Sequence, residues 1–242
     1  MTASTAVPHL MQQLRTVNPS APRLIWYGPN SERIELSGRV LDNWVAKTSN
    51  LLVEELDAEP GTRVSLLLPG HWKTLVWALA CWQVGAVPAA SPVTADPAAD
   101  IVVSSDDTVA VNSPAQLLVL VALGALDLKY PGTIPAGAVD YAAEVRGYGD
   151  EFLDLPPAIE DQTAMELTDG DLSMAVLFDR AEACDWTPGG VLLVPAELPL
   201  ETTLAAAVHC WTTGGTLIVV HSTVDLSADL LASERVTDRV GA

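Results

Sequence analysis

A strand–helix–strand pattern with almost no charged side chains is the feature that most limits how this chain can fold. Arg63 to Leu68 is a nearly continuous apolar run, a turn follows at Pro69-Gly70, and Trp72 to Val84 is apolar on nearly all sides. Gly85 ends that helical pattern, and Ala86 to Ala90 returns as a short strand. Apolar strands of this kind need cover on both faces, and such a crossover is almost always right-handed. The sequence therefore predicts a layered α/β/α fold with a mostly parallel, doubly wound-like sheet.

The same region contains the one stretch long enough to raise the question of a membrane span. Thr74 to Ala95 has no charged residue. Gly85, Pro88 and Pro92 interrupt it, and lipid does not tolerate the irregular backbone that they introduce. We therefore interpret this stretch as a buried core. The first ten residues lack a basic segment followed by an apolar one, so we expect a soluble, cytoplasmic protein without a signal peptide.

Composition excludes several classes of partner. The chain has 242 residues, of which 49% are hydrophobic and 18% charged, so it can bury a substantial core. Its formal net charge is −19, and no cluster of Lys and Arg occurs. Because nucleic acids and anionic membranes are bound through clustered basic residues, neither is an expected partner.

Periodicity and turn residues predict the remaining elements, which we expect to form a single α/β domain over residues 1–242. The segment 127–170 is rich in Pro, Gly and acidic residues and is expected to be mostly irregular. The predicted elements are a helix within 1–20, a hairpin of 23–27 and 33–36, a helix capped by Ser37 and ending near Leu56, a strand at 101–103, a helix opened by Ser113-Pro114 and continuing through Leu126, a short helix at 138–146, strands at 172–178, 191–194 and 216–220, and helices at 200–211 and 225–235.

Two parts of this pattern match a known family. Residues 22–92 combine a strand pair, a helix, Pro60 to Val64, and Gly85 to Val87 in one order, and 199–220 leads from a helix through Gly214-Gly215-Thr216 into a strand. With Glu234 to Thr237 as the next helix exit, the chain resembles the N-terminal part of the adenylate-forming acyl-CoA synthetases and their luciferase-like and peptide-synthetase relatives. The family-like regions are 22–92 and 172–242. The matching positions carry structure and none of the chemistry.

The departures from the family determine the functional expectation. The resemblance implies a Ser/Thr- and Gly-rich loop ending in Pro-Lys after the strand predicted at 172–178, where backbone N–H groups and a lysine hold the phosphates of ATP. This sequence instead has Asp179 to Gly190, with three carboxylates before Trp186 and no lysine. The family's later ribose-binding and C-terminal catalytic motifs are also not found after Thr237. The resemblance therefore implies a fold without the activity.

Other candidate chemistry is weak, and we predict no catalytic, cofactor-binding or metal-binding residue. His209-Cys210 are neighbours on a helix and point about 100° apart, which favours a core cysteine beside a partly exposed histidine. Asp169-Gly170-Asp171 lacks the further oxygen ligands of a cation loop, and Gly147-Tyr148-Gly149 lacks the third glycine of a dinucleotide fingerprint. Cys81, Cys184 and Cys210 form no C-x-x-C pair. Trp44, Trp72, Trp77 and Trp82 have core-like spacing, although Trp72 is also placed to reach an apolar groove.

Three functions compete on this basis. The first is a pseudoenzyme domain that acts by binding a protein partner or a small ligand. The second is one half of a split acyl- or amino-acid-activating ligase, with another polypeptide supplying the missing motifs. The third is a binding module for an acyl chain, CoA or a nucleotide. Self-association is a further expectation, because an open sheet leaves an edge and an apolar face to cover.

Overall fold

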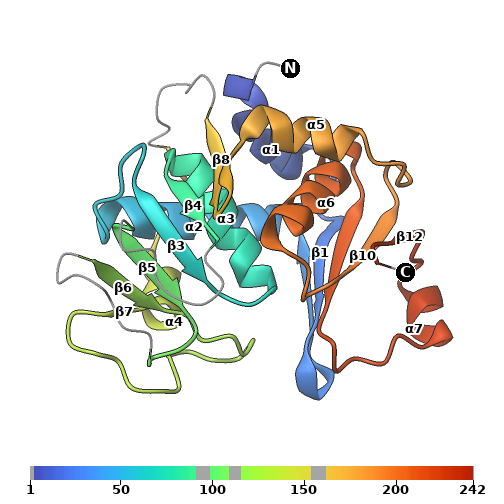
Figure 1. Ribbon diagram of the computed structural model, residues 1–242. Helices are drawn as coiled ribbons and strands as arrows, with labels where there is room; N and C mark the ends of the chain where they lie inside the picture. The colour runs from blue at the N-terminus through green and yellow to red at the C-terminus, as the bar shows by residue number, and fades with distance from the viewer. Residues whose placement is uncertain (1–2, 91–98, 109–115, 154–161, 242) are drawn as a thin grey trace. The chain divides into compact units, whose positions relative to one another are not determined.

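The computed structural model describes residues 3–90, 99–108, 116–153 and 162–241, and the chain in it forms two compact units. The first unit consists of Met1–Asp42, Pro69–Trp72 and Met174–Ala242. The second consists of Asn43–Leu68 and Lys73–Ser173. Each unit has its own mostly parallel sheet, so the predicted α/β class is confirmed (Figure 1). The single domain predicted over 1–242 stays a prediction.

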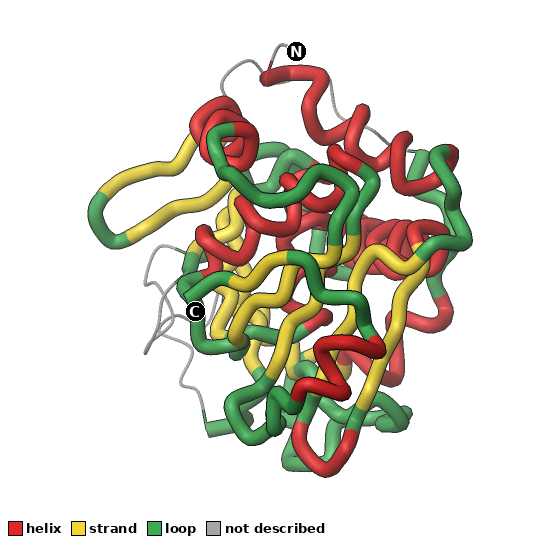
Figure 2. Tube along the Cα trace, turned by 90° about the vertical axis from the view of Figure 1, so that its right-hand side faces the viewer, coloured by secondary structure: helices red, strands yellow, loops and turns green. Residues whose placement is uncertain are grey.

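The first unit is built on a five-stranded sheet in the order β12-β10-β11-β1-β2. All neighbouring pairs in it are parallel except β1 and β2, which form an antiparallel hairpin. Its elements are α1 (Ala3–Thr16), β1 (Pro22–Tyr27), the 3₁₀ turn η1 (Pro29–Ser31), β2 (Arg33–Ser37), the start of α2 (Gly38–Glu54), α5 (Met174–Glu182), β10 (Val191–Pro195), α6 (Leu200–Thr213), β11 (Thr216–Val220), α7 (Ala228–Ser233) and β12 (Asp238–Arg239). Figure 2 shows η1 as the short helical tip of the β1–β2 hairpin at the bottom of the view.

Both faces of this first sheet are covered by apolar side chains. Ile25 of β1, Leu193 of β10 and Ile218 of β11 lie opposite one another across the sheet. They pack against Leu231 of α7 and Val236 after it. On the other side, α6 is the crossover between β10 and β11 and packs on both strands. Figure 1 draws α1, α5 and α6 as one group of helices and places α7 away from them. The near-continuous apolar strands are explained by this double cover.

The end of α6 is fixed by two glycines and one arginine. Gly214 has φ of +82° as the helix C-cap, a conformation that favours glycine. A Cβ on Gly215 would come within 2.5 Å of the carbonyl oxygen of Gly190, so that position also needs glycine. The guanidinium of Arg23 donates to the carbonyl oxygens of Gly214, Gly215 and Val17. The predicted exit from this helix through Gly214-Gly215-Thr216 into a strand is confirmed.

The second unit is built on a seven-stranded sheet in the order β7-β6-β5-β3-β4-β8-β9. Its pairs are parallel except β8 and β9. Its elements are most of α2, β3 (Arg63–Leu67), α3 (Trp72–Val84), β4 (Val87–Ala89), β5 (Ile101–Ser104), β6 (Leu117–Leu120), β7 (Val139–Asp140), α4 (Tyr141–Glu144), η2 (Val145–Gly147), β8 (Thr163–Leu167) and β9 (Gly170–Ser173). The predicted βαβ unit is confirmed as β3, α3 and β4, with β3 and β4 adjacent and parallel.

Two tryptophans of the second unit are core residues. Trp77 and Trp82 are each at most 1% exposed, and the Nε1–H of Trp82 donates to the carbonyl oxygen of Ala164 at 2.7 Å. Trp77 packs against Tyr141, whose hydroxyl is 2.7 Å from the Thr48 hydroxyl. Trp72, in the first unit, is 3% exposed. The core interpretation of these residues is therefore confirmed, while Trp44 is only partly buried.

Two of the predicted elements are wrong. The helix predicted to continue through Leu126 is replaced by β6, which pairs with β5 in parallel register from Ile101 opposite Leu117; its predicted cap, Ser113-Pro114, lies outside the described residues. The strand predicted at 172–178 ends at Ser173, and Met174 begins α5. In both segments a short apolar run has no periodicity of its own, so neighbouring strands and helices decide its structure.

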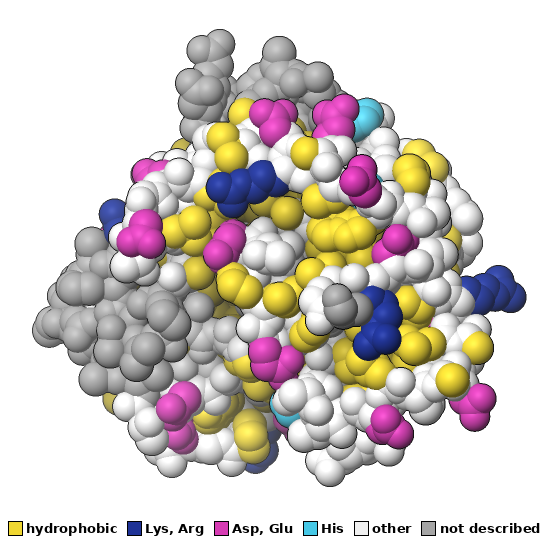
Figure 3. All heavy atoms as spheres, turned by 45° about the vertical axis from the view of Figure 1, so that its right-hand side comes forward, with side chains coloured by type: hydrophobic (Ala, Val, Ile, Leu, Met, Phe, Trp, Pro, Cys, Tyr) yellow, Lys and Arg dark blue, Asp and Glu magenta, His cyan; other side chains and the backbone are white. Residues whose placement is uncertain are grey.

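The surface agrees with the composition. Figure 3 shows Asp and Glu side chains scattered over the face in view, with few Lys and Arg among them. No helix among the described residues is long and apolar enough to cross a membrane. Cys81 and Cys210 are buried free thiols, and burial raises the pKa of Cys210 to about 12. Both cysteines are therefore inert core residues, as predicted for Cys210.

Candidate binding pocket

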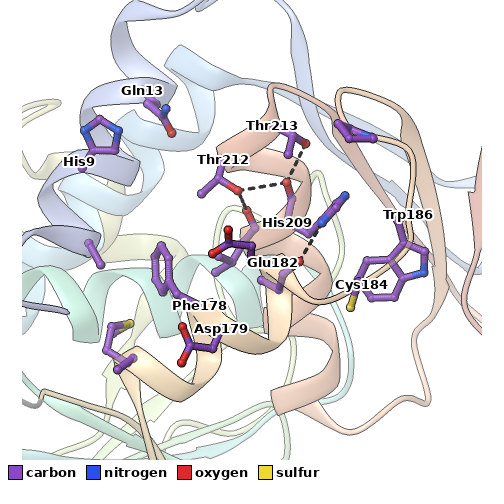
Figure 4. Close-up of a pocket in the computed structure, with 16 residues that line it drawn as sticks. His9, Gln13, Phe178, Asp179, Glu182, Cys184, Trp186, His209, Thr212 and Thr213 are labelled. Carbon is purple, nitrogen blue, oxygen red and sulfur yellow. Dashed lines mark hydrogen bonds between the residues drawn. The ribbon is translucent and has the colours of Figure 1, made fainter. Parts of the chain in front are cut away.

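A cavity of about 580 Å³ opens within the first unit, between α1, α5 and α6 (Figure 4). We call it the α1–α5–α6 pocket. Its walls come from segments at opposite ends of the sequence, and the chain from Cys184 to Pro188 closes one side. The lining residues are Ala6, His9 and Gln13 of α1, Met174, Ala175, Phe178, Asp179, Ala181 and Glu182 of α5, Cys184, Trp186 and Pro188 of the loop, and Val208, His209, Thr212 and Thr213 of α6.

His209 is the buried polar residue of this pocket. It is 6% exposed, and its Nδ1 lies 2.9 Å from the carbonyl oxygen of Ala181. Because that oxygen can only accept, Nδ1 carries the proton and donates. The Nε2 atom is fully buried and has no hydrogen-bond partner among the described residues. His209 therefore has a buried ring nitrogen whose hydrogen-bonding capacity is not used by the described residues, which is uncommon in protein interiors.

The loop after α5 holds His209 from the opposite side. The indole of Trp186 meets the imidazole edge-to-face, with ring centroids 5.4 Å apart. Gly189 N–H donates to the Thr213 hydroxyl at 3.1 Å, and that hydroxyl donates to the His209 carbonyl oxygen at 2.8 Å. These contacts tie the loop to the last turn of α6. The imidazole thus contacts α5 through Ala181 and the loop through Trp186, as Figure 4 shows.

The α1 wall adds a second buried acceptor. Gln13 Oε1 is buried and has no hydrogen-bond partner in the described part of the chain. Its amide points from α1 toward α5 and α6 in Figure 4. Phe178 of α5 is half-buried and supplies an aromatic face between the two helices. The pocket therefore combines aromatic walls with a few polar atoms, the usual composition of a small-molecule site.

The charged residues of the pocket are acidic. Asp179 and Glu182 are exposed on α5 and line the opening, and no Lys or Arg is among the lining residues. The segment 179–190, predicted from the sequence to replace a phosphate loop, is instead the last turn of α5 and the loop that closes this pocket. A polyphosphate placed here would face two carboxylates and no cation.

The remaining sequence candidates lie apart from one another. His209 and Cys210 do not pair, because Nδ1 of His209 bonds to Ala181, but His209 is buried where partial exposure was expected. Asp169 lies in an exposed turn and Asp171 on the exposed part of β9, and the described residues include no group of three side chains suited to a metal ion. Gly147 ends the 3₁₀ turn η2 and does not follow a strand.

The connection between β8 and β9 is the shortest in the second sheet. Leu167 and Gly170 are paired across the hairpin, so only Thr168 and Asp169 lie between the two strands. β8 itself is a parallel neighbour of β4, with Glu166 opposite Ala89. A parallel strand in this sheet therefore ends in a two-residue turn and returns directly as an edge strand.

Comparison with known sequences gives one distant relative and no family model. No model of a known protein family matches the sequence. A Mycobacterium tuberculosis (strain ATCC 25618 / H37Rv) protein described as a TIGR03089 family protein is 36% identical over 159 residues, which cover 63% of this chain and 64% of that protein.

Comparison with solved structures is decisive for the fold. An acyl-CoA synthetase from Brucella canis matches with a TM-score of 0.72 at 16% identity, covering 99% of this chain. The fold is that of an acyl-CoA synthetase N-terminal part. The N-terminal subdomain of Klebsiella oxytoca NpsA, solved with 3-hydroxybenzoyl-AMSN, shares this acyl-CoA synthetase fold, with a TM-score of 0.68 at 16% identity over 97% of this chain. The chain spans 47% of the Brucella protein and 59% of the Klebsiella chain.

Proposed function

We propose that this chain is a non-catalytic domain of the acyl-CoA synthetase fold that acts by binding a small molecule. The observation that carries the proposal is the segment 179–190. The resemblance implies a Ser/Thr- and Gly-rich loop ending in Pro-Lys after the strand predicted at 172–178, and the chain there continues as the last turn of α5 and a loop with three carboxylates and no lysine. Such a segment offers a triphosphate net like charge and no lysine.

The charge of the chain supports the same conclusion. The sequence has no lysine after Lys129, so a phosphate-binding lysine cannot come from the part that contains β8, α5 and α6. The α1–α5–α6 pocket supports binding as the alternative activity, because it is a preformed cavity of about 580 Å³ with aromatic side chains in its walls.

The test is to measure ATP–pyrophosphate exchange by the pure protein with a panel of carboxylic acids, together with calorimetric titration of Mg-ATP and of AMP. We expect exchange no faster than in a protein-free control and no heat at about millimolar ATP, since affinities weaker than that correspond to less than about 4 kcal/mol of binding free energy. Binding of Mg-ATP at micromolar strength, or measurable exchange, would contradict the proposal.

One half of a split ligase is the second candidate, and the partial coverage favours it. The chain matches only 47% of the Brucella acyl-CoA synthetase, so another polypeptide can supply the rest. The discriminating experiment is affinity purification of the tagged chain from its native cells. A stoichiometric companion that restores ATP–pyrophosphate exchange would establish the split enzyme and overturn the binding-domain proposal.

A further inference from the structure

We propose that the outer edge of strand β2 is a dimer surface, on which β2 of one copy pairs antiparallel with β2 of a second copy. The two-fold axis passes beside Ile34, and the pairing joins the first sheets of both copies into one continuous sheet. The inference goes beyond the proposed function and does not depend on it, because it uses only the β1–β2 hairpin.

Strand β2 is the last strand of the first sheet, and its backbone groups alternate between β1 and the outer edge. Tyr27 lies opposite Arg33, and Ile25 lies opposite Glu35. The carbonyl oxygen of Tyr27 accepts from His221 N–H at 2.9 Å and so points toward β11. Opposite residues of an antiparallel pair turn their backbone groups either toward each other or both away. The N–H and C=O groups of Arg33 and Glu35 therefore point away from β1.

A hydrogen bond at the tip of the hairpin agrees with this alternation. Gly28 N–H donates to the carbonyl oxygen of Glu32 at 2.9 Å, so the even-numbered residues of this strand face β1. No described residue forms a hydrogen bond with the backbone groups of Arg33 and Glu35 on the outer side. An edge with unpaired donors and acceptors is a template for another strand.

Hydrogen bonding and charge together select one register for two copies of β2. Only registers that pair Arg33 and Glu35 among themselves bring outward groups of both strands together. Arg33 opposite the partner's Arg33, or Glu35 opposite the partner's Glu35, places like charges directly across, which destabilises the pair. In the remaining register Arg33 lies opposite the partner's Glu35 on both sides of the axis. That register uses every outward N–H and C=O group of the two residues.

The other face of the strand brings two isoleucines together. Ile34 is half-buried and lies between the two charged residues, so the axis places it opposite the partner's Ile34. This is a non-hydrogen-bonded pair, in which side chains approach most closely. The side chains of Arg33 and Glu35 are 38% and 42% exposed and already form an ion pair of 2.7 Å within one chain. Exposed charges add little affinity, so they select the register while backbone bonds and Ile34 hold the dimer.

The first test is sedimentation velocity of the full chain at increasing protein concentration. The buffer contains about 0.15 M salt, because the net charge of −19 repels a second copy and charges more than about 8 Å apart are then screened. We expect a monomer–dimer equilibrium with a dissociation constant of about 10–100 μM, as for a small interface. A chain that stays monomeric at about 500 μM would overturn the proposal and leave the edge to a strand of another protein.

A proline substitution tests the backbone bonds. Glu35→Pro removes an N–H that faces the outer edge, so the bonds between β1 and β2 stay intact while a donor to the partner's Arg33 carbonyl is lost. We expect the dissociation constant to rise at least about tenfold, with an unchanged circular dichroism spectrum. A dimer of unchanged affinity in folded Glu35→Pro would contradict pairing through β2.

A charge change covers the case in which the proline variant does not fold. Glu35→Lys places a cation opposite the partner's Arg33 at both ends of the pair, so the dissociation constant should rise about fivefold. The control Glu59→Lys makes the same change of net charge at an exposed position outside β2, and should leave the dimer as tight or tighter. Equal weakening by both lysine substitutions would refute the register.

A cysteine at the axis reports the register directly. Paired Cα atoms in a non-hydrogen-bonded pair are about 4.5 Å apart, within the range of a disulfide. With Cys184→Ser removing the partly exposed native thiol, Ile34→Cys should form an inter-chain disulfide as oxidised glutathione is reduced, and the exposed Val40→Cys should not. A dimer that does not link through position 34 would exclude this pairing. None of these readouts involves ATP or a ligand, so their failure leaves the proposed function untouched.

Discussion

Arg23 is a buried cation whose hydrogen bonds all go to backbone carbonyls. It is 4% exposed and joins the end of α1, at Val17, to the last carbonyls of α6 at Gly214 and Gly215. Burial lowers the pKa of its guanidinium, whereas these oxygens and the negative end of α6 stabilise its charge.

Replacing Arg23 should therefore destabilise the protein strongly. We expect Arg23→Met to lower the free energy of unfolding by about 2–3 kcal/mol, because three backbone carbonyls lose a charged donor and the hydrogen bond to Gly215 is buried. The measurement is urea unfolding followed by circular dichroism. The control is Arg39→Met on the exposed side of α2, which should cost less than about 0.5 kcal/mol. Equal losses of unfolding free energy in the two variants would show that Arg23 does not stabilise the junction between α1 and α6.

Glu234 should make the stability of the protein depend on pH in the acid range. Burial alone would raise its pKa, but hydrogen bonds from Arg33 and Tyr27 outweigh burial and the pKa is lowered. A carboxyl group whose pKa is lower in the folded than in the unfolded protein stabilises the fold at pH values above its unfolded pKa of about 4.3. That stabilisation is lost as the pH falls through the pKa of the folded protein.

The stability difference between the wild type and Glu234→Gln should follow that rule. We expect the wild type to be more stable by about 1 kcal/mol at pH 7, a modest value because Arg33 is partly exposed to solvent screening. The difference should vanish below about pH 3. Urea midpoints across pH measure it, and Glu59→Gln, at an exposed position, should show no such trend. A constant difference at all pH values would contradict the assignment.

At the scale of elements, the glycine at position 214 suits the left-handed backbone conformation at the end of α6. Its φ of +82° suits glycine, and no atom other than Arg23 Nη1, at 3.9 Å, lies within 4 Å of an added Cβ. Any effect of a methyl group there is therefore conformational. We expect Gly214→Ala to lower the free energy of unfolding by about 1 kcal/mol.

Thermal or urea unfolding of Gly214→Ala measures this cost. The matched control is Gly147→Ala, where a Cβ meets nothing within 4 Å and φ is not in the left-handed region. That change should be neutral or stabilise slightly, because alanine restricts the unfolded chain more than glycine does. Similar costs at the two positions would rule out the conformational explanation.

The elements that the sequence predicted correctly are those with a strong local signal. Ser37 accepts from Val40 N–H and caps α2, as its position predicted, and α3 has the predicted bounds Trp72–Val84. By contrast, β6 owes its strand conformation to pairing with β5, and α5 owes its helix to packing on α6. Short apolar runs such as Leu117 to Leu120 fit either structure, so only their neighbours decide.

The pocket was beyond sequence reasoning for a similar reason. Gln13 and His209 are separated by 196 positions, and neither lies in a recognisable motif. The acidic segment from Asp179 onward attracted attention for its charge, and it does line the pocket, but its role in closing a cavity depends on α1. A buried histidine without a second partner becomes visible only when all surrounding atoms are placed.

At the scale of the whole molecule, the connectivity of the two units suggests cooperative unfolding. The chain passes between them four times, and two of these passages run inside helices, at Asp42 in α2 and at Trp72 in α3. Neither unit can unfold without breaking helical turns of the other. We therefore propose that residues 1–242 form one cooperative domain, as the sequence predicted.

Differential scanning calorimetry checks this expectation. A single transition should appear, with a calorimetric enthalpy equal to the van't Hoff enthalpy. The acyl-CoA synthetase fold does not determine whether the two units unfold in one transition or in two. Calorimetry therefore decides between these outcomes. Two resolved transitions would show that the units are separate domains.

The three cysteines differ in exposure, so that one of them can carry a label that reports on the pocket. Cys81 and Cys210 are sealed in the core, whereas Cys184 is partly exposed and lines the α1–α5–α6 pocket. Burial and the nearby Asp185 raise the pKa of the Cys184 thiol, so maleimide reacts with it slowly at neutral pH and faster in mild alkali. A dye attached to the unmodified sequence therefore goes to a single position, beside the cavity, where its emission reports whatever enters.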